Sequence, residues 1–352
     1  MSAVPSPQHQ IDFLTKLQRL LGEGSFVSTY KYALLMALAD LCLELGDDDD
    51  APLRIDTRRI GEKFIEYYWR QSAPFMPASE VAGGVLRQNT GEAPKVIRLL
   101  EQQRSQFQGS LTGARQNLPS WSKLVGQVTA QVRKMPLWKL QTVGREKLGF
   151  LYGPSADGKA IELKAGVAYC FRRHHGLVAD LVRGAWAQYV RRYNSEVFGA
   201  GVDLHEFLFG SERANLGTVM PILWEVQKGC CFYCGGAARR DSAHVDHFIP
   251  WARYPVDLGH NFVLVHGQPC NAKKSDRLAC SEHLSAWVQR NRDFGTTLSE
   301  EFAQRRITHN LTASNRIVRW AYRLTEQCGG LTWRRADDLV PLDSEWEQLL
   351  AT

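Results

Sequence analysis

The residues with the clearest chemical potential lie between Cys231 and Asp276. The stretch contains Cys-Phe-Tyr-Cys at 231–234, His-Val-Asp-His-Phe-Ile-Pro at 244–250, His-Asn-Phe-Val-Leu at 260–264 and Cys-Asn-Ala-Lys-Lys-Ser-Asp at 270–276. It therefore brings together thiols, an adjacent Asp-His pair, asparagines and lysines. Such a set can hold a structural zinc ion, a hard divalent cation, a general base and a phosphate.

The cysteines of this stretch indicate a metal site. Cys231 and Cys234 have the two-residue spacing of a zinc knuckle, and Cys270 could supply a third thiolate. Five of the eight cysteines fall between Cys230 and Cys280. We expect a cytoplasmic protein, in which thiols are reduced, so this concentration favours a metal over disulfides.

The Asp-His pair lies in a segment with the pattern of a strand. Residues 245–250 have the alternating pattern of a strand, in which successive side chains point to opposite faces, so Asp246 and His247 face opposite sides. A histidine titrates near neutrality and can act as a general base. Asn261 precedes a second apolar run, residues 262–265, which favours a second strand.

Together these motifs resemble the HNH nucleases (the His-Me finger or ββα-metal family), in the bacterial type with a CxxC zinc knuckle. The match is to the HNH domain of the RNA-guided CRISPR effector nucleases. It consists of an Asp-His-x-x-Pro strand, an Asn before a short apolar run, and Asn-x-x-Lys-Ser-Asp. The resemblance covers only the minor part of the chain that carries these motifs.

The resemblance implies a role for each residue of the site. Asp246 and Asn271 would be ligands of a catalytic Mg²⁺ or Mn²⁺, for which a carboxylate and an amide are suitable hard oxygen donors. His247 would be the general base, and Asn261 would orient the loop that bears it. The catalytic set is thus His247, Asp246, Asn261 and Asn271.

The resemblance also implies a phosphate contact and leaves one position open. Lys274, with Lys273 beside it, would bind phosphate near the start of a helix. His244 stands where the CRISPR nucleases carry an acid. His244 could hydrogen-bond a ligand of the metal ion or act as an additional ligand itself, and the sequence does not decide between these roles.

The structural zinc needs a fourth ligand besides Cys231, Cys234 and Cys270. HNH nucleases often carry a second CxxC here, but in this chain Gly267 stands three residues before Cys270. We expect His266 to replace the missing cysteine. His283 is the alternative ligand, and Cys230 or Cys280 rank below it. The competing interpretation is that the cysteines are vestigial and the fold holds without metal.

The composition of the whole chain narrows the class of protein. The 352 residues carry a net charge of +6 and are 44% hydrophobic, which is ordinary for a globular protein. The mild basic excess fits a nucleic-acid partner, and we expect DNA. No apolar run is long enough to cross a membrane, and the polar start, residues 1–10, has no signal core.

The elements expected around these motifs are mostly helical. Apolar spacing predicts two helices over 9–46, a helix over 53–72, and two short strands around a turn within 150–163. Further helices are expected at 92–108, 120–134 and 167–194. The fold class is α+β, with a mainly helical targeting, sensing or interaction domain (1–195), a small ββα-metal HNH domain with a zinc knuckle (196–295) and a helical C-terminal extension (296–352).

These features lead to one expected function and two alternatives. The expected function is a metal-dependent endonuclease that hydrolyses DNA, in phage defence or restriction. The first alternative is a zinc-stabilised protein that binds nucleic acid without cutting it. The second is a nuclease subunit controlled by a partner protein or by homo-oligomerisation through residues 1–195.

Overall fold

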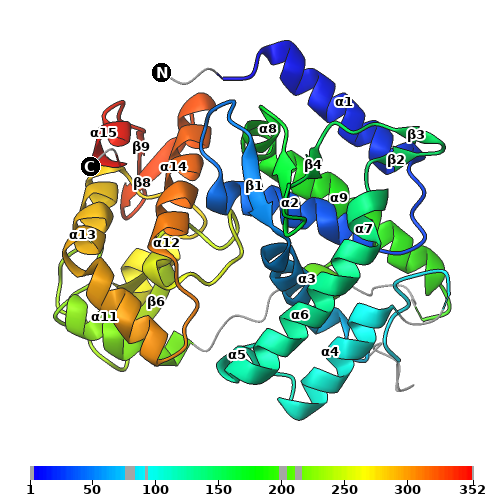
Figure 1. The fold of residues 1–352 in the computed structure, drawn as a ribbon. Helices are drawn as coiled ribbons and strands as arrows, with labels where there is room; N and C mark the ends of the chain where they lie inside the picture. The colour runs from blue at the N-terminus through cyan, green and yellow to red at the C-terminus, as the bar shows by residue number, and fades with distance from the viewer. Residues whose placement is uncertain (1–3, 76–83, 92–93, 198–203, 211–215, 351–352) are drawn as a thin grey trace. The chain divides into compact units, whose positions relative to one another are not determined.

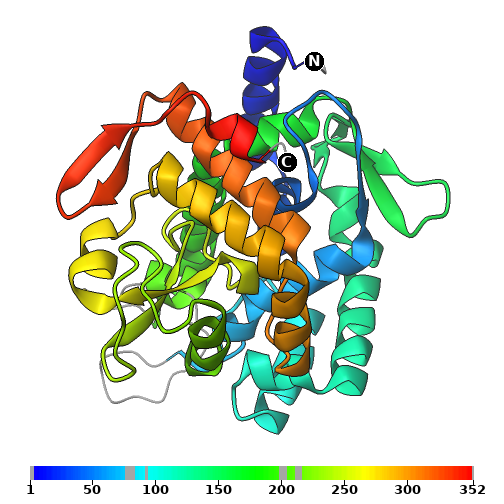
Figure 2. The ribbon, with the colours of Figure 1, turned by 90° about the vertical axis from the view of Figure 1, so that its left-hand side faces the viewer.

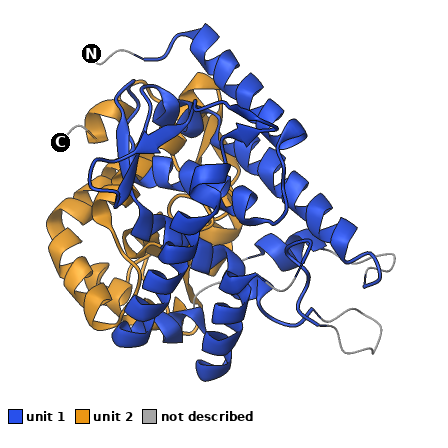
Figure 3. Ribbon diagram, turned by 45° about the vertical axis from the view of Figure 1, so that its right-hand side comes forward, with its two compact units in different colours: residues 1–212 blue, residues 213–352 orange. Residues whose placement is uncertain are grey.

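The computed structural model describes residues 4–75, 84–91, 94–197, 204–210 and 216–350 (Figure 1). The chain divides into two compact units, Met1–Glu212 (unit 1) and Arg213–Thr352 (unit 2), which Figure 3 colours separately. Helices dominate, and the strands form small antiparallel sheets. The fold is therefore mixed α and β, as the α+β class requires.

The division into units can be compared with the expected domains. The sequence placed a boundary at 195/196, next to the Gly-Ala-Gly at 199–201, which lies outside the described residues. The two units divide after Glu212, and residues 296–352 belong to unit 2.

Unit 1 is built mainly from helices. The two helices expected over 9–46 are confirmed, and the helix expected over 167–194 is present as two helices that meet at His174. The helices are α1 (Pro7–Glu23), α2 (Tyr30–Leu45), α3 (Thr57–Gln71), α4 (Lys95–Gln106), α5 (Leu111–Gln116), α6 (Leu118–Lys134), α7 (Pro136–Lys139), α8 (Val167–Arg173), α9 (His175–Tyr193) and α10 (Leu204–Phe209).

The strands of unit 1 form two small sheets. The strands β1 (Leu53–Asp56), β4 (Tyr152–Pro154) and β5 (Ala160–Leu163) pair in the order β1-β5-β4, while β2 (Thr142–Val143) pairs with β3 (Glu146–Lys147). The two strands expected within 150–163 are thus confirmed as β4 and β5. The helix expected from residue 53 was wrong at its start: residues 53–56 pair with β5, and Asp56 then caps α3 by accepting from the Arg58 N–H.

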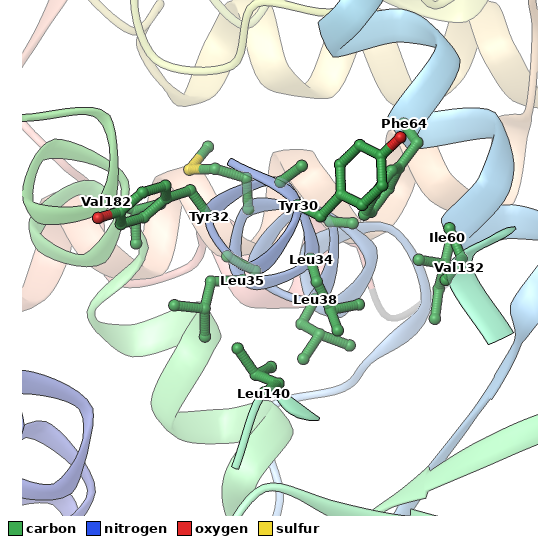
Figure 4. Packing of buried hydrophobic residues seen from close by; sticks show 14 of the residues in the cluster. Tyr30, Tyr32, Leu34, Leu35, Leu38, Ile60, Phe64, Val132, Leu140 and Val182 are labelled. Atoms are coloured by element: carbon green, nitrogen blue, oxygen red, sulfur yellow. The ribbon is translucent and has the colours of Figure 1, made fainter. Parts of the chain in front are cut away.

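Helix α2 forms the centre of the core of unit 1. Its residues from Tyr30 to Leu43 are all buried, because it is apolar almost all round. Figure 4 shows its side chains meeting those of neighbouring elements on several sides. The residues labelled there are Tyr30, Tyr32, Leu34, Leu35 and Leu38 of α2, with Ile60, Phe64, Val132, Leu140 and Val182 around them.

A helix buried on all sides must pair its polar residues. Asp40 of α2 accepts a hydrogen bond from Tyr67 (2.6 Å) and bonds His175 Nε2 (2.8 Å). Lys63 lies 2.6 Å from Glu44 and 3.1 Å from Glu66. Burial alone would raise the pKa of Asp40, but the hydrogen bond and charge of His175, with further help from Lys63, lower it to about 2.

This depressed pKa predicts an acid-labile contribution to stability. The carboxylate stabilises the folded state above its unfolded pKa, near 3.8, and that contribution is lost as the pH falls towards 2. We expect a loss of about 2 kcal/mol across this window. Urea unfolding of the full-length protein between pH 2 and 5 measures it. Asp40→Asn should flatten the pH dependence, whereas Asp180→Asn, at an exposed position of α9, should leave it unchanged.

Unit 2 contains two antiparallel strand pairs among its helices, and the first pair is the hairpin that carries the expected Asp-His pair. The hairpin strands are followed directly by a short helical turn and later by two long helices. The elements are η1 (Leu216–Thr218), α11 (Met220–Val226), β6 (Ala243–His247), η2 (Gly259–Asn261), β7 (Phe262–His266), η3 (Gly267–Asn271), α12 (Ala272–Lys274), α13 (Ser281–Gln304), α14 (Leu311–Gln327), β8 (Leu331–Arg335), β9 (Asp338–Pro341) and α15 (Trp346–Leu350). Across the described residues of both units, no helix has the length and apolar character needed to span a membrane.

Helix α13 fixes the start of β7 through two buried side chains. Trp287 donates to the carbonyl of His260 (3.1 Å) and stacks on Phe248. Arg290 donates to the carbonyls of His260 (2.6 Å) and Phe262 (2.5 Å). Burial lowers the pKa of Arg290 to about 9, which still leaves it charged at neutral pH. These bonds hold the backbone on both sides of Asn261.

The C-terminal hairpin β8–β9 is joined to the centre of unit 2 by its backbone (red in Figure 2). Trp333 donates its N–H to Leu278 (2.7 Å) and accepts from the N–H of Cys280 (2.8 Å). Its ring lies 5.2 Å from that of Tyr233 and stacks on His283. Residues beyond 330 therefore pack beside the Cys-x-x-Cys segment.

Candidate active site and metal centre

The hairpin β6–β7 is the framework of the site. Its strands are antiparallel, with Asp246 opposite Val263 and His247 opposite Phe262. The segment before β6 bonds β7 at Leu264. The Phe232 N–H donates to the Leu264 carbonyl (2.8 Å), and the Gln227 side chain bonds both the N–H and the carbonyl of Leu264. The Cys-x-x-Cys turn is thereby held against β7, next to His266.

The expected zinc ligands form one cluster. The ligand atoms of Cys231, Cys234, His266 and Cys270 all lie within 4.8 Å of one another. Ligands of a tetrahedral zinc ion are roughly 3.5–3.8 Å apart, given its bond lengths to sulfur and nitrogen. The cluster could hold a metal ion, and its three sulfurs and one imidazole fit zinc. His266 is the fourth member, as expected from comparison with the second CxxC of the family that the motifs resemble.

Hydrogen bonds orient His266 toward the sulfurs. Its Nδ1 lies 3.3 Å from Cys234 Sγ, while Nε2 lies 3.1 Å from the carbonyl of Ala237. A ligand histidine commonly donates its second N–H to such a carbonyl, which fixes the tautomer and leaves the first nitrogen for the metal. Burial and the neighbouring thiols of Cys231 and Cys234 raise the pKa of Cys270, so the cluster needs a cation to hold its thiolates together.

The alternative zinc ligands have other partners. His283 bonds the carbonyl of Arg334 (2.8 Å), and Cys280 donates to Glu282 (2.6 Å). Cys230 pairs with Ala237 through an isolated backbone bridge, and its thiol donates to the carbonyl of Lys228. Among the described residues, none of the three belongs to the cluster.

Asp246 is half-buried, with one oxygen occupied and one open. Its Oδ2 accepts from Lys274 Nζ (3.0 Å) and from the Tyr233 hydroxyl (3.3 Å). Burial, and next the charge of Asp246, hold the pKa of Tyr233 well above its usual range, so this hydroxyl stays a donor. The other oxygen of Asp246, Oδ1, bonds none of the residues that the structure describes. A cation could approach this oxygen.

Lys274 has a different position from the one expected. It is the last residue of the short helix α12, its side chain is fully buried, and its amine also donates to the carbonyl of His247 (3.0 Å). Burial lowers its pKa, although Asp246 acts in the opposite direction. The structure thus gives this amine an internal ion pair, where the sequence suggested a phosphate contact. Lys273 is exposed and pairs with Asp337 (2.7 Å).

His247 is bonded to a residue that the sequence analysis missed. Its Nε2 lies 2.8 Å from Oδ1 of Asp257, and the side chain is 8% exposed. Edge-on rings of Trp251 and Phe262 flank the imidazole. One signal could have identified Asp257: it is the single acidic residue between His247 and Asn261.

Asn261 bonds the segment that follows His247. Its side chain accepts from the N–H of Ile249 (2.8 Å) and donates to the carbonyl of the same residue (3.0 Å). Its own carbonyl accepts from the Phe248 N–H (2.7 Å). This pairing extends the hairpin past β6 and fixes the backbone just after His247.

Asn271 ends η3, which packs against both β6 and β7. Its side chain is half-buried and bonds none of the described residues. The helix that it opens has three residues, Ala272–Lys274. His244, the position left open, is exposed at the start of β6.

Comparison with known proteins bears on unit 1. A model of the family described as Domain of unknown function (DUF8808) matches residues 10–207. The curated proteins give no match, and neither do the solved structures.

Proposed function

The chain belongs to the family described as Domain of unknown function (DUF8808), and because the family model ends at residue 207, we propose an activity from unit 2: a metal-dependent endonuclease of the HNH type that hydrolyses DNA. One observation carries this proposal. Asp246 and His247 are neighbours on β6 and point to opposite faces. The carboxylate oxygen Oδ1 of Asp246 and the ring nitrogen Nδ1 of His247 have no partner among the described residues.

The residues around a scissile phosphodiester would divide the work. Asp246 and Asn271 would hold a divalent cation, whose charge would offset that of the phosphate and of the leaving 3′ oxygen. His247 would take a proton from the attacking water. Asn261 would keep His247 in place through its two bonds to Ile249. The oxygen donors fit Mg²⁺ or Mn²⁺.

The Cys₃His cluster would have a structural role. We propose that it binds zinc, because its donors are sulfur and nitrogen and all four positions belong to the protein. A closed four-ligand site leaves no position for substrate. The ion would fasten the Cys-x-x-Cys turn to the end of β7, two elements that frame the Asp-His pair. A role in phage defence or restriction, and the role of unit 1, stay predictions.

Plasmid cleavage tests the proposal. Purified full-length protein should nick or linearise supercoiled DNA with Mg²⁺ or Mn²⁺, and EDTA should stop the reaction. His247→Ala should lower the rate by about 100-fold or more, the usual contribution of general-base catalysis. His205→Ala, at an exposed position of unit 1, should retain it.

Three outcomes would contradict the nuclease proposal. The first is cleavage that continues in EDTA, and the second is equal cleavage by His247→Ala. The third is a folded protein that shifts DNA in a gel without cutting it, which would favour the non-catalytic nucleic-acid-binding alternative.

A further inference from the structure

From the contact between His247 and Asp257 we infer that Asp257 is a positioning residue: it holds His247 as the Nε2–H tautomer and thereby makes Nδ1 the basic nitrogen. The catalytic part of this inference rests on the proposed nuclease function. The tautomer itself does not, and it can be measured separately.

The contact determines which nitrogen carries the proton. A carboxylate can only accept, so the ring nitrogen 2.8 Å from Asp257 Oδ1 must be the donor, Nε2–H. In a neutral imidazole the lone pair then lies on Nδ1. Among the described residues Nδ1 has no hydrogen-bond partner, and this atom is not fully buried. A water molecule can therefore reach it.

Both members of the contact are held in place. The rings of Trp251 and Phe262 lie 5.0 and 4.9 Å from the imidazole, at steep angles to it. The loop that carries Asp257 is closed by backbone bonds from Leu258 to Val256 and from Asn261 to Leu258. The carboxylate therefore meets the ring in a defined geometry, and forming the contact costs little conformational freedom at the time of reaction.

The contact also supports the charge that would develop during the reaction. Water breaks one O–H bond, its proton goes to Nδ1, and its oxygen forms a bond to phosphorus. The phosphorus–oxygen bond to the 3′ side breaks, and that oxygen takes a proton from solvent. The imidazolium formed in this step donates Nε2–H to the Asp257 carboxylate, which stabilises it, and later releases the Nδ1 proton to solvent.

Nitrogen-15 NMR of the full-length protein labelled at histidine tests the tautomer. In spectra of the neutral imidazole, the His247 signals should show a protonated Nε2 and an unprotonated Nδ1, with His247→Ala providing the assignment. Asp257→Ala should shift these signals toward a mixture of tautomers. Asp257→Asn keeps the shape of the side chain, but its amide can pair with either tautomer, so it should also give a mixture.

Plasmid cleavage with the same variants tests the catalytic part. Asp257→Ala should lower kcat about 10- to 100-fold, the usual effect of losing a carboxylate behind a working histidine, with little change in KM. Asp241→Ala, which removes an exposed carboxylate paired only with Arg239 among the described residues, should change neither kcat nor the tautomer.

The outcomes separate this inference from the proposed function. An unchanged tautomer in both Asp257 variants would overturn the inference, whether or not the protein cuts DNA. A shifted tautomer with an unchanged kcat would overturn its catalytic part. A shifted tautomer in a protein that never cuts DNA would support the positioning role and contradict the nuclease proposal.

Discussion

Cys231→Ser should release the metal of the Cys₃His cluster and unfold the part of unit 2 that carries the Asp-His pair. Full-length protein should contain about one zinc ion per chain, as a single four-ligand site requires. The four ligands come from the Cys-x-x-Cys turn before β6, the end of β7 and η3, so an ion bound there would join these three segments directly. Structural zinc sites contribute on the order of 10 kcal/mol to folding.

The loss has a simple electrostatic cause. Burial, and next the neighbouring thiols of Cys231 and Cys234, raise the pKa of Cys270, so without a cation this group stays a neutral thiol and the attraction between thiolate and metal ion is missing. Chelation should have the same effect as the mutation. Elemental analysis gives the zinc content, and calorimetry or limited proteolysis follows the unfolding of unit 2.

Cys328→Ser is the matched control, because this cysteine is exposed at the end of α14 and outside the cluster. It should keep both the zinc and the melting behaviour of the wild type. If Cys231→Ser retained a full complement of zinc, or lost it without any change in stability, the structural role of the cluster would be refuted.

Lys274→Met should destabilise unit 2 by about 3 kcal/mol, as removal of one member of a buried ion pair does. The amine is fully buried and lies 3.0 Å from both Asp246 Oδ2 and the carbonyl of His247. Its removal leaves a mostly buried carboxylate that retains the Tyr233 hydroxyl alone among the described residues. Urea unfolding of the full-length protein measures the loss.

Two further variants isolate the ion pair from the loss of packing. Lys273→Met removes an exposed pair with Asp337 and should cost no more than about 1 kcal/mol. Asp246→Asn combined with Lys274→Met should recover much of the stability, because no uncompensated charge is left. A Lys274→Met protein as stable as Lys273→Met would show that the pair does not hold the site together.

The sequence predicted those parts of the site that depend on spacing. His266 was expected as the fourth ligand because Gly267 occupies the position of the missing cysteine, and the structure brings His266 to the three thiols. The strand expected around Asp246 and His247 and the second strand expected after Asn261 are present as β6 and β7. The two helices expected over 9–46 follow from the apolar spacing of that segment, and they are present as α1 and α2.

What the sequence did not predict depends on contacts made after folding. The resemblance placed Lys274 near the start of a helix, where it would meet phosphate, but it is the last residue of the short helix α12, and its amine pairs with Asp246. Asp257 lies outside the motifs described in the sequence analysis, and its contact with His247 arises from the path of the loop between them. Residues 53–56 continue the apolar pattern of the next helix, and only their pairing with β5 makes them a strand.

The docking of β8 sets the size of the portion that could be moved to another protein. A gene fusion that ended at residue 295, the expected end of the HNH domain, would lack Trp333, whose backbone bonds Leu278 and Cys280 and whose ring packs on Tyr233. Tyr233 donates to Asp246, so the loss of Trp333 would indirectly weaken the support of this carboxylate. The transferable module therefore extends through β9, to residue 341, well beyond its signature sequence.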